Sequence, residues 1–262
     1  GWTDWRWVAV AATIGCSAKS SPSVITSVAT GIIRIDTNGV VVDDQADERP
    51  WVDVTVEMVE GTMESPVGVA DSPTWSGFGA IHVRVNCTPD YDKKQYAFET
   101  RDTDGEDVDA SFFGLPEEED WVLAAPFSDK TLMRNHLMFS WSRAIGRYAP
   151  RTRFVELYME DGGDTVGPED YRGVYVLTEK VKRDVHRVNV DKLEPTDSAP
   201  SVVTGGYLLR RDWVEVEPIE TRLYGDMLML ESPKPDEVTS PQLDYIEGYL
   251  NDFESALSRG DG

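Results

Sequence analysis

The chain has 262 residues, of which 40% are hydrophobic and 10% aromatic, enough for a substantial core in one large domain or two small ones. Its 48 Asp and Glu against 25 Lys and Arg give a formal net charge of -23, which excludes a general affinity for nucleic acid or an anionic membrane. Any phosphate ligand must therefore be held by a local basic pocket. The acidic residues are scattered through turns, which indicates a solvated surface such as one adapted to high salt, with cation binding as the alternative.

The amino-terminal segment 1–24 has a pattern typical of exported proteins. An apolar run over 7–15, WVAVAATIG, follows Arg6 and precedes Cys16 and a Ser-rich stretch. It predicts a secretory signal ending in a lipoprotein-type cysteine, and hence an extracellular or cell-surface protein. The alternative is that the segment is an ordinary apolar strand or a disordered start. The run is shorter than the ~20 residues of a transmembrane helix. Cys16 and Cys87 allow one disulfide but no disulfide framework, and no Cys and His spacing indicates zinc.

Strands are predicted to dominate the chain up to residue 125. Val52, Val54 and Val56 alternate with polar residues, so one face of that strand is expected to be buried and the other wet. Asn38-Gly39 is a strong two-residue turn signal after an earlier strand. A Gly-, Ser- and Pro-rich stretch over 61–79 predicts a loop. The predicted strands of this half are residues 25–36, 51–58, 80–85 and 94–100.

A helix is predicted after residue 123, with Ser128 as its N-cap and Asp129 at its positive end. Met133, Leu137 and Trp141 recur at fourfold spacing, which predicts an apolar face buried in the core. Such a helix start is suited to binding an anion, although solvated surface charges are the alternative. The polar residues of its first two turns that point to this site are Lys130, Arg134 and Asn135.

A β-hairpin is predicted from residues 152–160 and 171–181, joined by an acidic loop. The densest positive cluster of the chain follows this hairpin. In so acidic a protein, such a cluster favours a functional role, and the alternative is a solvated charged face. The members of this cluster are Lys180, Lys182, Arg183 and Arg187. After a Ser-, Pro- and Thr-rich linker, the sequence predicts a strand from residue 205 and an amphipathic helix from Ser240 to Gly260.

Common catalytic motifs are missing from the sequence, which contains no GxSxG, HExxH, Walker P-loop, HRD or DFG pattern. His82 lies on a predicted strand and His136 on a predicted helix, where a structural role is expected. Paired acids such as Asp43-Asp44 suit turns and caps better than glycoside hydrolysis, which needs two carboxyl groups in one cleft. The residues alone therefore predict an α+β domain with a candidate anion pocket.

An ordered series of segments adds a family resemblance. The segments are 93–102 (KKQYAFETRD), 112–123 (FFGLPEEEDWVL), 129–135 (DKTLMRN), 147–158 (RYAPRTRFVELY), 171–184 (YRGVYVLTEKVKRD), 187–190 (RVNV), 205–212 (GGYLLRRD) and 232–257 (SPKPDEVTSPQLDYIEGYLNDFESAL). In this order they resemble motifs of the CotH kinases, a family named for a spore-coat protein kinase. The resemblance covers residues 25–262, weakly before residue 80.

The resemblance implies an atypical protein-kinase-like fold of the α+β class, with a strand-rich amino-terminal lobe and the beginning of a larger lobe. It implies an enzyme that transfers phosphate from ATP to Ser or Thr of secreted, coat or surface proteins, with Mg²⁺ as the metal. The expected partners are thus ATP and a protein substrate, with no nucleic acid and no transmembrane segment.

Nucleotide-binding residues follow from the same resemblance. Arg84 begins a loop that in the family is of the Arg-Gly-Ser-Ser type, but here Val85 replaces the Gly and admits fewer backbone conformations. Phosphoryl transfer needs cations at the phosphates, and Glu179 is expected near the adenine or in an ion pair. The full candidate set is Arg84, Lys93, Lys94, Lys130, Arg134, Glu179 and Lys180.

The Asn- and Asp-containing catalytic stretch and the Trp-Asp-Phe-Asp type metal motif of the family are not found in this sequence. We therefore expect an incomplete, amino-terminal part of the domain without independent phosphotransfer, and we assign no catalytic residue and no metal ligand. The alternative is a coat or surface interaction module that keeps the family fold, which the altered loop 85–88 favours. An extracellular carbohydrate-associated domain has only the aromatic residues in its favour.

Overall fold

The computed structural model describes residues 28–42, 49–84, 91–163, 165–211, 219–221 and 225–259. The expected mixture of helix and strand is confirmed, and in these ranges ten strands far outnumber two α-helices. The predicted signal segment 1–24 and the altered loop 85–88 lie outside the described residues. No helix in the described part of the chain is long and apolar enough to cross a membrane.

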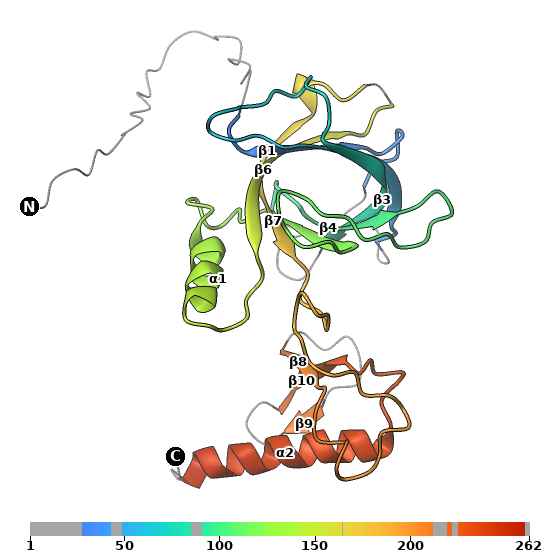
Figure 1. The fold of residues 1–262 in the computed structure, drawn as a ribbon, viewed down its shortest axis with the longest axis vertical. Helices are drawn as coiled ribbons and strands as arrows, with labels where there is room; N and C mark the ends of the chain where they lie inside the picture. The colour runs from blue at the N-terminus through green and yellow to red at the C-terminus, as the bar shows by residue number, and fades with distance from the viewer. Residues whose placement is uncertain are drawn as a thin grey trace, which may run out of the picture.

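Seven strands close into a barrel (Figure 1). Neighbouring strands pair antiparallel, except that β1 and β6 lie parallel, with Ile32 opposite Glu156. This long-range pair closes the barrel, in the order β1-β2-β3-β4-β5-β7-β6. The strands are β1 (Gly31–Asp36), β2 (Val52–Val59), β3 (Trp75–Arg84), β4 (Gln95–Arg101), β5 (Asp120–Ala124), β6 (Thr152–Glu160) and β7 (Tyr171–Glu179), and a short 3-10 turn, η1 (Pro168–Asp170), precedes β7.

Alternate side chains of the strands fill the barrel interior. On β2, Val56 is buried and Asp53 is exposed, as period-two alternation predicts. The ring of Phe112 lies 4.9 Å from that of Trp75 and 5.3 Å from that of Trp121, measured between centroids. These aromatic contacts, supplied by the strands and their connecting loops, form the core of the barrel.

The predicted loop over 61–79 is wrong at its end, because β3 begins at Trp75. Gly77 and Gly79 pair there with β2 in regular register. A Cβ atom added at Gly79 would lie 2.4 Å from the carbonyl oxygen of Glu99 on β4. The glycines that suggest a loop in the sequence therefore allow close approach between strands.

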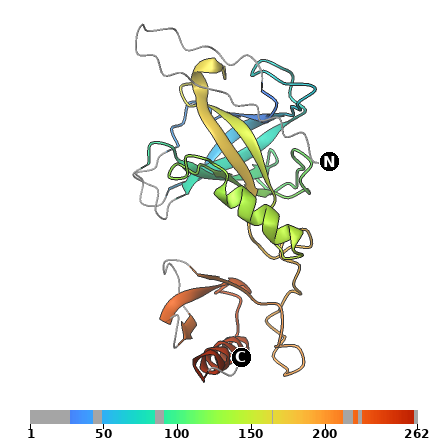
Figure 2. The ribbon, with the colours of Figure 1, turned by 90° about the vertical axis from the view of Figure 1, so that its left-hand side faces the viewer.

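A smaller unit follows the barrel and is joined to it by a long connecting segment (Figures 1 and 2). It is a three-stranded antiparallel sheet in the order β8-β10-β9, covered on one face by α2. Ile219, Leu230 and Ile246 form the buried contact between sheet and helix. The predicted carboxy-terminal helix is confirmed as far as the described residues extend. The bounds are β8 (Leu208–Arg211), β9 (Ile219–Thr221), β10 (Gly225–Ser232) and α2 (Ser240–Arg259).

The first helix, α1 (Arg134–Ala144), begins later than predicted. Its N-cap position is Met133, not Ser128 as predicted, and no cap side chain accepts a hydrogen bond there. The Asp129 carboxylate instead accepts the backbone N–H groups of Thr131 at 3.1 Å and of Arg134, the first helical residue, at 3.0 Å. Hydrogen bonding by the Thr131 hydroxyl and by the Arg134 N–H lowers the pKa of Asp129, as expected for a carboxylate at a helix start.

The prediction that α1 presents a buried apolar face is also wrong, because none of its residues is buried. The Trp141 side chain is 60% exposed and that of Met138 59%. α1 lies outside the barrel beside β6 (Figures 1 and 2), where His136 Nδ1 is 2.6 Å from Thr152 Oγ1. Since strand side chains already fill the barrel, α1 contacts it through one narrow face and leaves the rest of its apolar surface uncovered.

Candidate functional site

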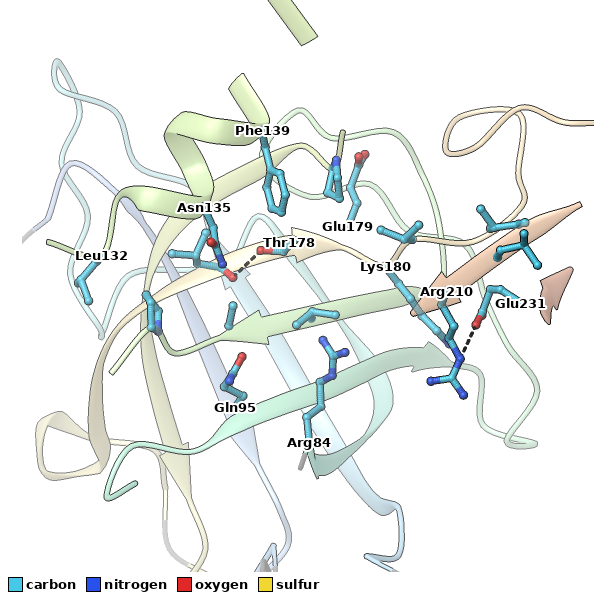
Figure 3. Close-up of a pocket in the computed structure, with 18 residues that line it drawn as sticks. Arg84, Gln95, Leu132, Asn135, Phe139, Thr178, Glu179, Lys180, Arg210 and Glu231 are labelled. Atoms are coloured by element: carbon cyan, nitrogen blue, oxygen red, sulfur yellow. Dashed lines mark hydrogen bonds and ion pairs between the residues drawn. The ribbon is translucent and has the colours of Figure 1, made fainter. Parts of the chain in front are cut away.

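A cleft of about 480 Å³ opens between the end of the barrel, α1 and the sheet of the smaller unit (Figure 3). This volume is within the range of roughly 300–1,000 Å³ found for small-molecule sites. Each of the three parts contributes apolar side chains, so the cleft has apolar walls. These are Val122, Ala124 and Val176 from the barrel, Leu132 and Phe139 from α1 and the residues before it, and Leu208 and Leu209 from β8.

Three cations line the same cleft: Arg84 at the end of β3, Lys180 just after β7 and Arg210 on β8. Arg210 Nε lies 3.4 Å from Glu231 Oε2 on the neighbouring strand, and Lys180 Nζ lies 2.9 Å from Asp120 Oδ1. Figure 3 shows Lys180 and Arg210 close together at one end of the cleft, and Arg84 rising into it from β3. The cleft thus has a cationic lining in a chain of net charge -23, which suits an anionic ligand with an apolar part.

Glu179 lines the cleft too, but its carboxylate is fully buried and engaged elsewhere. Its Oε1 accepts hydrogen bonds from Arg151 Nε at 2.6 Å and from Arg187 Nη1 at 2.9 Å. Its Oε2 accepts the backbone N–H of Arg151 at 2.8 Å. Of the two roles expected for Glu179, the structure therefore shows an ion pair.

The four other sequence-predicted residues do not line the cleft. Lys93 donates to the carbonyl of Val174 and lies over the Tyr175 ring, and burial lowers its pKa. Lys130 Nζ lies 3.8 Å from the centroid of the Phe127 ring. These two lysines make local contacts with the barrel and the loop before α1.

Lys94 and Arg134 complete this group. Lys94 accepts a hydrogen bond from the Tyr175 hydroxyl through its backbone carbonyl, at 3.0 Å. Arg134 is mostly exposed and pairs with Asp129 at 3.6 Å. The structure thus brings Arg84, Glu179 and Lys180 into one site and leaves Lys93, Lys94, Lys130 and Arg134 outside it.

Sequence reasoning missed several polar residues of the cleft. Asn135 is not among them, because the sequence predicts it with Arg134 at the start of the helix and it does line the cleft. Arg210 had a signal, because it lies in the segment 205–212 that carries the family resemblance. Gln95 and Thr178 adjoin the predicted residues Lys94 and Glu179 in the sequence, whereas Glu231 lies far from them and reaches the cleft because β10 pairs with β8.

Outside the cleft, the carboxylates of Asp109, Glu118 and Glu119 lie within 4.8 Å of one another. Lys182 Nζ lies 2.6 Å from Glu118 Oε1 and 2.5 Å from Glu119 Oε1. Burial, together with a hydrogen bond to Glu119, raises the pKa of Glu118 to about 7. Burial acts against ionisation of Glu119 as well, but hydrogen bonds with Glu118 and Lys182 hold its pKa well below the usual range.

These arrangements do not fit a catalytic metal. In the acidic cluster, the ammonium group of Lys182 already occupies the place that a cation would take. Among the described residues of the cleft, the acids are Glu179 and Glu231, and both pair with arginines. Neither set offers the free, converging carboxylates that a magnesium ion requires.

Comparison with protein families gives one match. The family model described as CotH kinase protein matches residues 81–261. This range begins within β3, ends after α2 and includes every residue that lines the cleft. No curated protein matches the chain.

Proposed function

Because the chain belongs to the CotH kinase protein family, we propose that the cleft binds ATP and that the protein takes part in phosphate transfer to Ser or Thr of coat or surface proteins. The proposal extends to an extracellular or cell-surface location with a lipoprotein-type anchor, for which the pattern over 1–24 is the support. Mg²⁺ supplies charge neutralisation at the phosphates when it is bound. The described acids of the cleft, Glu179 and Glu231, are engaged with arginines and so are not offered as ligands to it.

The observation that carries the proposal is the meeting of three cations and an apolar slot in one cleft. Phosphoryl transfer depends on positioning and on stabilising the charge of the phosphate oxygens. Arg84, Lys180 and Arg210 come from three distant parts of the chain and supply that charge. The apolar walls at Val122 and Val176 suit a planar base. ATP has both features, an apolar base and a polyanionic tail.

Calorimetric titration of the chain with ATP, with and without Mg²⁺, tests the proposal. Arg84→Ala and Lys180→Ala are each expected to weaken ATP binding about tenfold, a loss of about 1.4 kcal/mol. Arg172→Ala is the matched control, since Arg172 pairs with Asp161 at 3.2 Å and does not line the cleft. A chain that shows no ATP binding would overturn the proposal.

Lys94→Ala separates the family-derived candidates from the cleft residues. Lys94 does not line the cleft, so we expect a smaller effect than that of Lys180→Ala. Radioactive labelling of a Ser- and Thr-rich protein substrate with ATP then tests the transfer itself.

A second candidate is a non-catalytic coat or surface interaction module with the family fold. The exposed apolar residues of α1, among them Met138 and Trp141, favour it. This alternative predicts that ATP does not bind and that Trp141→Glu weakens association with isolated coat or surface proteins while the fold is kept.

A further inference from the structure

The turn formed by residues 180–188, hereafter the connecting turn, carries the chain out of the barrel. Its first two residues, Lys180 and Val181, line the cleft. Its backbone is closed on itself, because Val188 donates to the carbonyl of Lys182 at 3.1 Å and Arg187 to that of Asp184 at 3.1 Å. The connecting turn is therefore a compact unit between the two walls of the cleft.

A buried ion pair attaches this turn to the barrel. Glu179 and Arg187 both have side chains with 0% exposure, and Arg187 Nη1 donates to Glu179 Oε1 at 2.9 Å. In the described part of the chain, Nε and Nη2 of Arg187 have no hydrogen-bond partner. Glu179 gives the guanidinium its hydrogen bond, with Glu118 Oε2 farther away at 4.0 Å from Nε. Glu179 also holds Arg151, just before β6.

A second attachment runs through Lys182, and it shares Glu118 with Arg187, whose Nε lies 4.0 Å from Glu118 Oε2. Lys182 Nζ lies within 3.0 Å of carboxylate oxygens of Glu118, Glu119 and Asp120, at the start of β5. Together the two attachments tie the connecting turn to β5, β6 and β7. A turn held to the barrel by two of its own cations, Lys182 and Arg187, has little freedom to rotate against it.

The chain is attached to the smaller unit a few residues later. The buried side chain of Gln242 on α2 donates to the carbonyls of Glu194 at 2.8 Å and Asp197 at 3.2 Å. The stretch from residue 189 to residue 193 thus links the anchored turn to the smaller unit. One wall of the cleft belongs to the barrel and another, at Leu209 and Arg210, to the smaller unit.

We propose that Glu179 and Arg187 are positioning residues, whose buried ion pair holds the connecting turn and thereby sets the width of the cleft. The consequence for ATP affinity rests on the function proposed above, whereas the consequence for cleft width does not. Neither residue needs to touch the ligand, since both act through Lys180, Val181 and the chain that follows.

Distance measurement between two spin labels tests the width directly. In the full chain with Cys16→Ser and Cys87→Ser, labels are placed through Ala144→Cys on α1 and Asp252→Cys on α2, both of which are exposed positions. The parent chain is expected to give one narrow distance distribution. Glu179→Gln and Arg187→Met are each expected to broaden it at least twofold.

Lys192→Met is the matched control, because Lys192 lies in the 189–193 stretch and forms an exposed ion pair with Glu194 at 2.9 Å. Its distribution is expected to stay narrow. If a single variant fails to fold, the double variant Glu179→Met and Arg187→Met removes both charges together, and Lys182→Met releases the second attachment. Folded variants with an unchanged distribution would overturn the inference.

The same proteins are titrated with ATP. We expect Glu179→Gln and Arg187→Met to bind ATP about tenfold more weakly than Lys192→Met does. At saturating ATP, their spin-label distance distributions are expected to become partly narrow again. A parent chain that does not bind ATP would refute the proposed function, while the label distances would still decide whether the ion pair sets the cleft width.

Discussion

The ammonium nitrogen of Lys182 lies 2.6 Å from a carboxylate oxygen of Glu118. Lys182 follows β7 and Glu118 precedes β5, so the contact joins the connecting turn to the barrel. Glu118 is 3% exposed, and it shares Lys182 with Glu119. A buried carboxyl group next to a second one releases its proton at higher pH than an isolated glutamate.

The first prediction concerns the pH dependence of stability. Burial, with the hydrogen bond to Glu119, raises the pKa of Glu118 from 4.5 to about 7. Folded Glu118 therefore keeps a proton that the unfolded chain has released, so its contribution is fully present below pH 4.5 and is lost as the pH rises towards 7. Glu118→Gln is expected to remove this loss. Between pH 5 and pH 8, the free energy of unfolding of the variant should therefore rise by about 1 to 2 kcal/mol relative to that of the parent chain, allowing for solvent screening.

Urea unfolding of both proteins at the two pH values measures this difference. Glu117→Gln is the control, because Glu117 neighbours Glu118 in the sequence but is not a partner of Lys182. Parallel pH profiles for the parent chain and Glu118→Gln would contradict the raised pKa.

The sequence pattern predicts strands where polar and apolar residues alternate regularly, because this alternation depends on local burial alone. The run from Val52 to Val56 is an example, and it forms β2 as expected. The pattern does not predict β9 or β10. Barrel closure could not be predicted in this way. It requires β1 to pair in parallel with β6, between residues as distant as Ile32 and Glu156, and no local periodicity encodes such a pair.

For α1, the sequence shows an amphipathic helix, but it does not show whether another part of the protein packs against the apolar face. The fourfold spacing of Met133, Leu137 and Trp141 is real, yet the barrel core is filled by strand residues. In the same way, the sequence does not show which residues meet in the cleft. The cations Arg84, Lys180 and Arg210 lie far apart in sequence, and a resemblance of short segments identifies two of the three without showing that they meet.

The second prediction compares two tryptophans. Trp121 is 1% exposed, and its indole N–H donates to the carbonyl of Glu118 at 3.0 Å. Trp121→Ala is expected to lower the free energy of unfolding by about 3–5 kcal/mol, since it leaves a cavity in the barrel core. Trp141→Ala on the exposed face of α1 is expected to change it by less than about 1 kcal/mol. Equal losses, measured by urea unfolding, would show that α1 is covered.

The third prediction concerns the start of α1. Asp129→Ala removes the acceptor for the Thr131 and Arg134 N–H groups, so faster amide exchange is expected in the first turn of α1. Ser128→Ala is the matched control and should leave exchange unchanged. The pKa of Asp129 is lowered in the folded chain, so the stabilising effect of its carboxylate is present above the ordinary Asp pKa of 3.8 and is lost as the pH falls through the lowered value. Faster exchange in Ser128→Ala than in Asp129→Ala would contradict this assignment.

The last prediction uses the opposite charges of Arg210 and Glu231, whose side chains lie 3.4 Å apart in the cleft. If the phosphates of ATP bind beside Arg210, the carboxylate of Glu231 repels them. Arg210→Gln is therefore expected to weaken ATP binding several-fold, and Glu231→Gln to strengthen it several-fold, because one change removes a favourable charge and the other an unfavourable one. Both effects should shrink at high salt. Calorimetric titration at low and high salt measures them, and weaker binding in both variants would instead mean that the ion pair itself shapes the β8–β10 wall of the cleft.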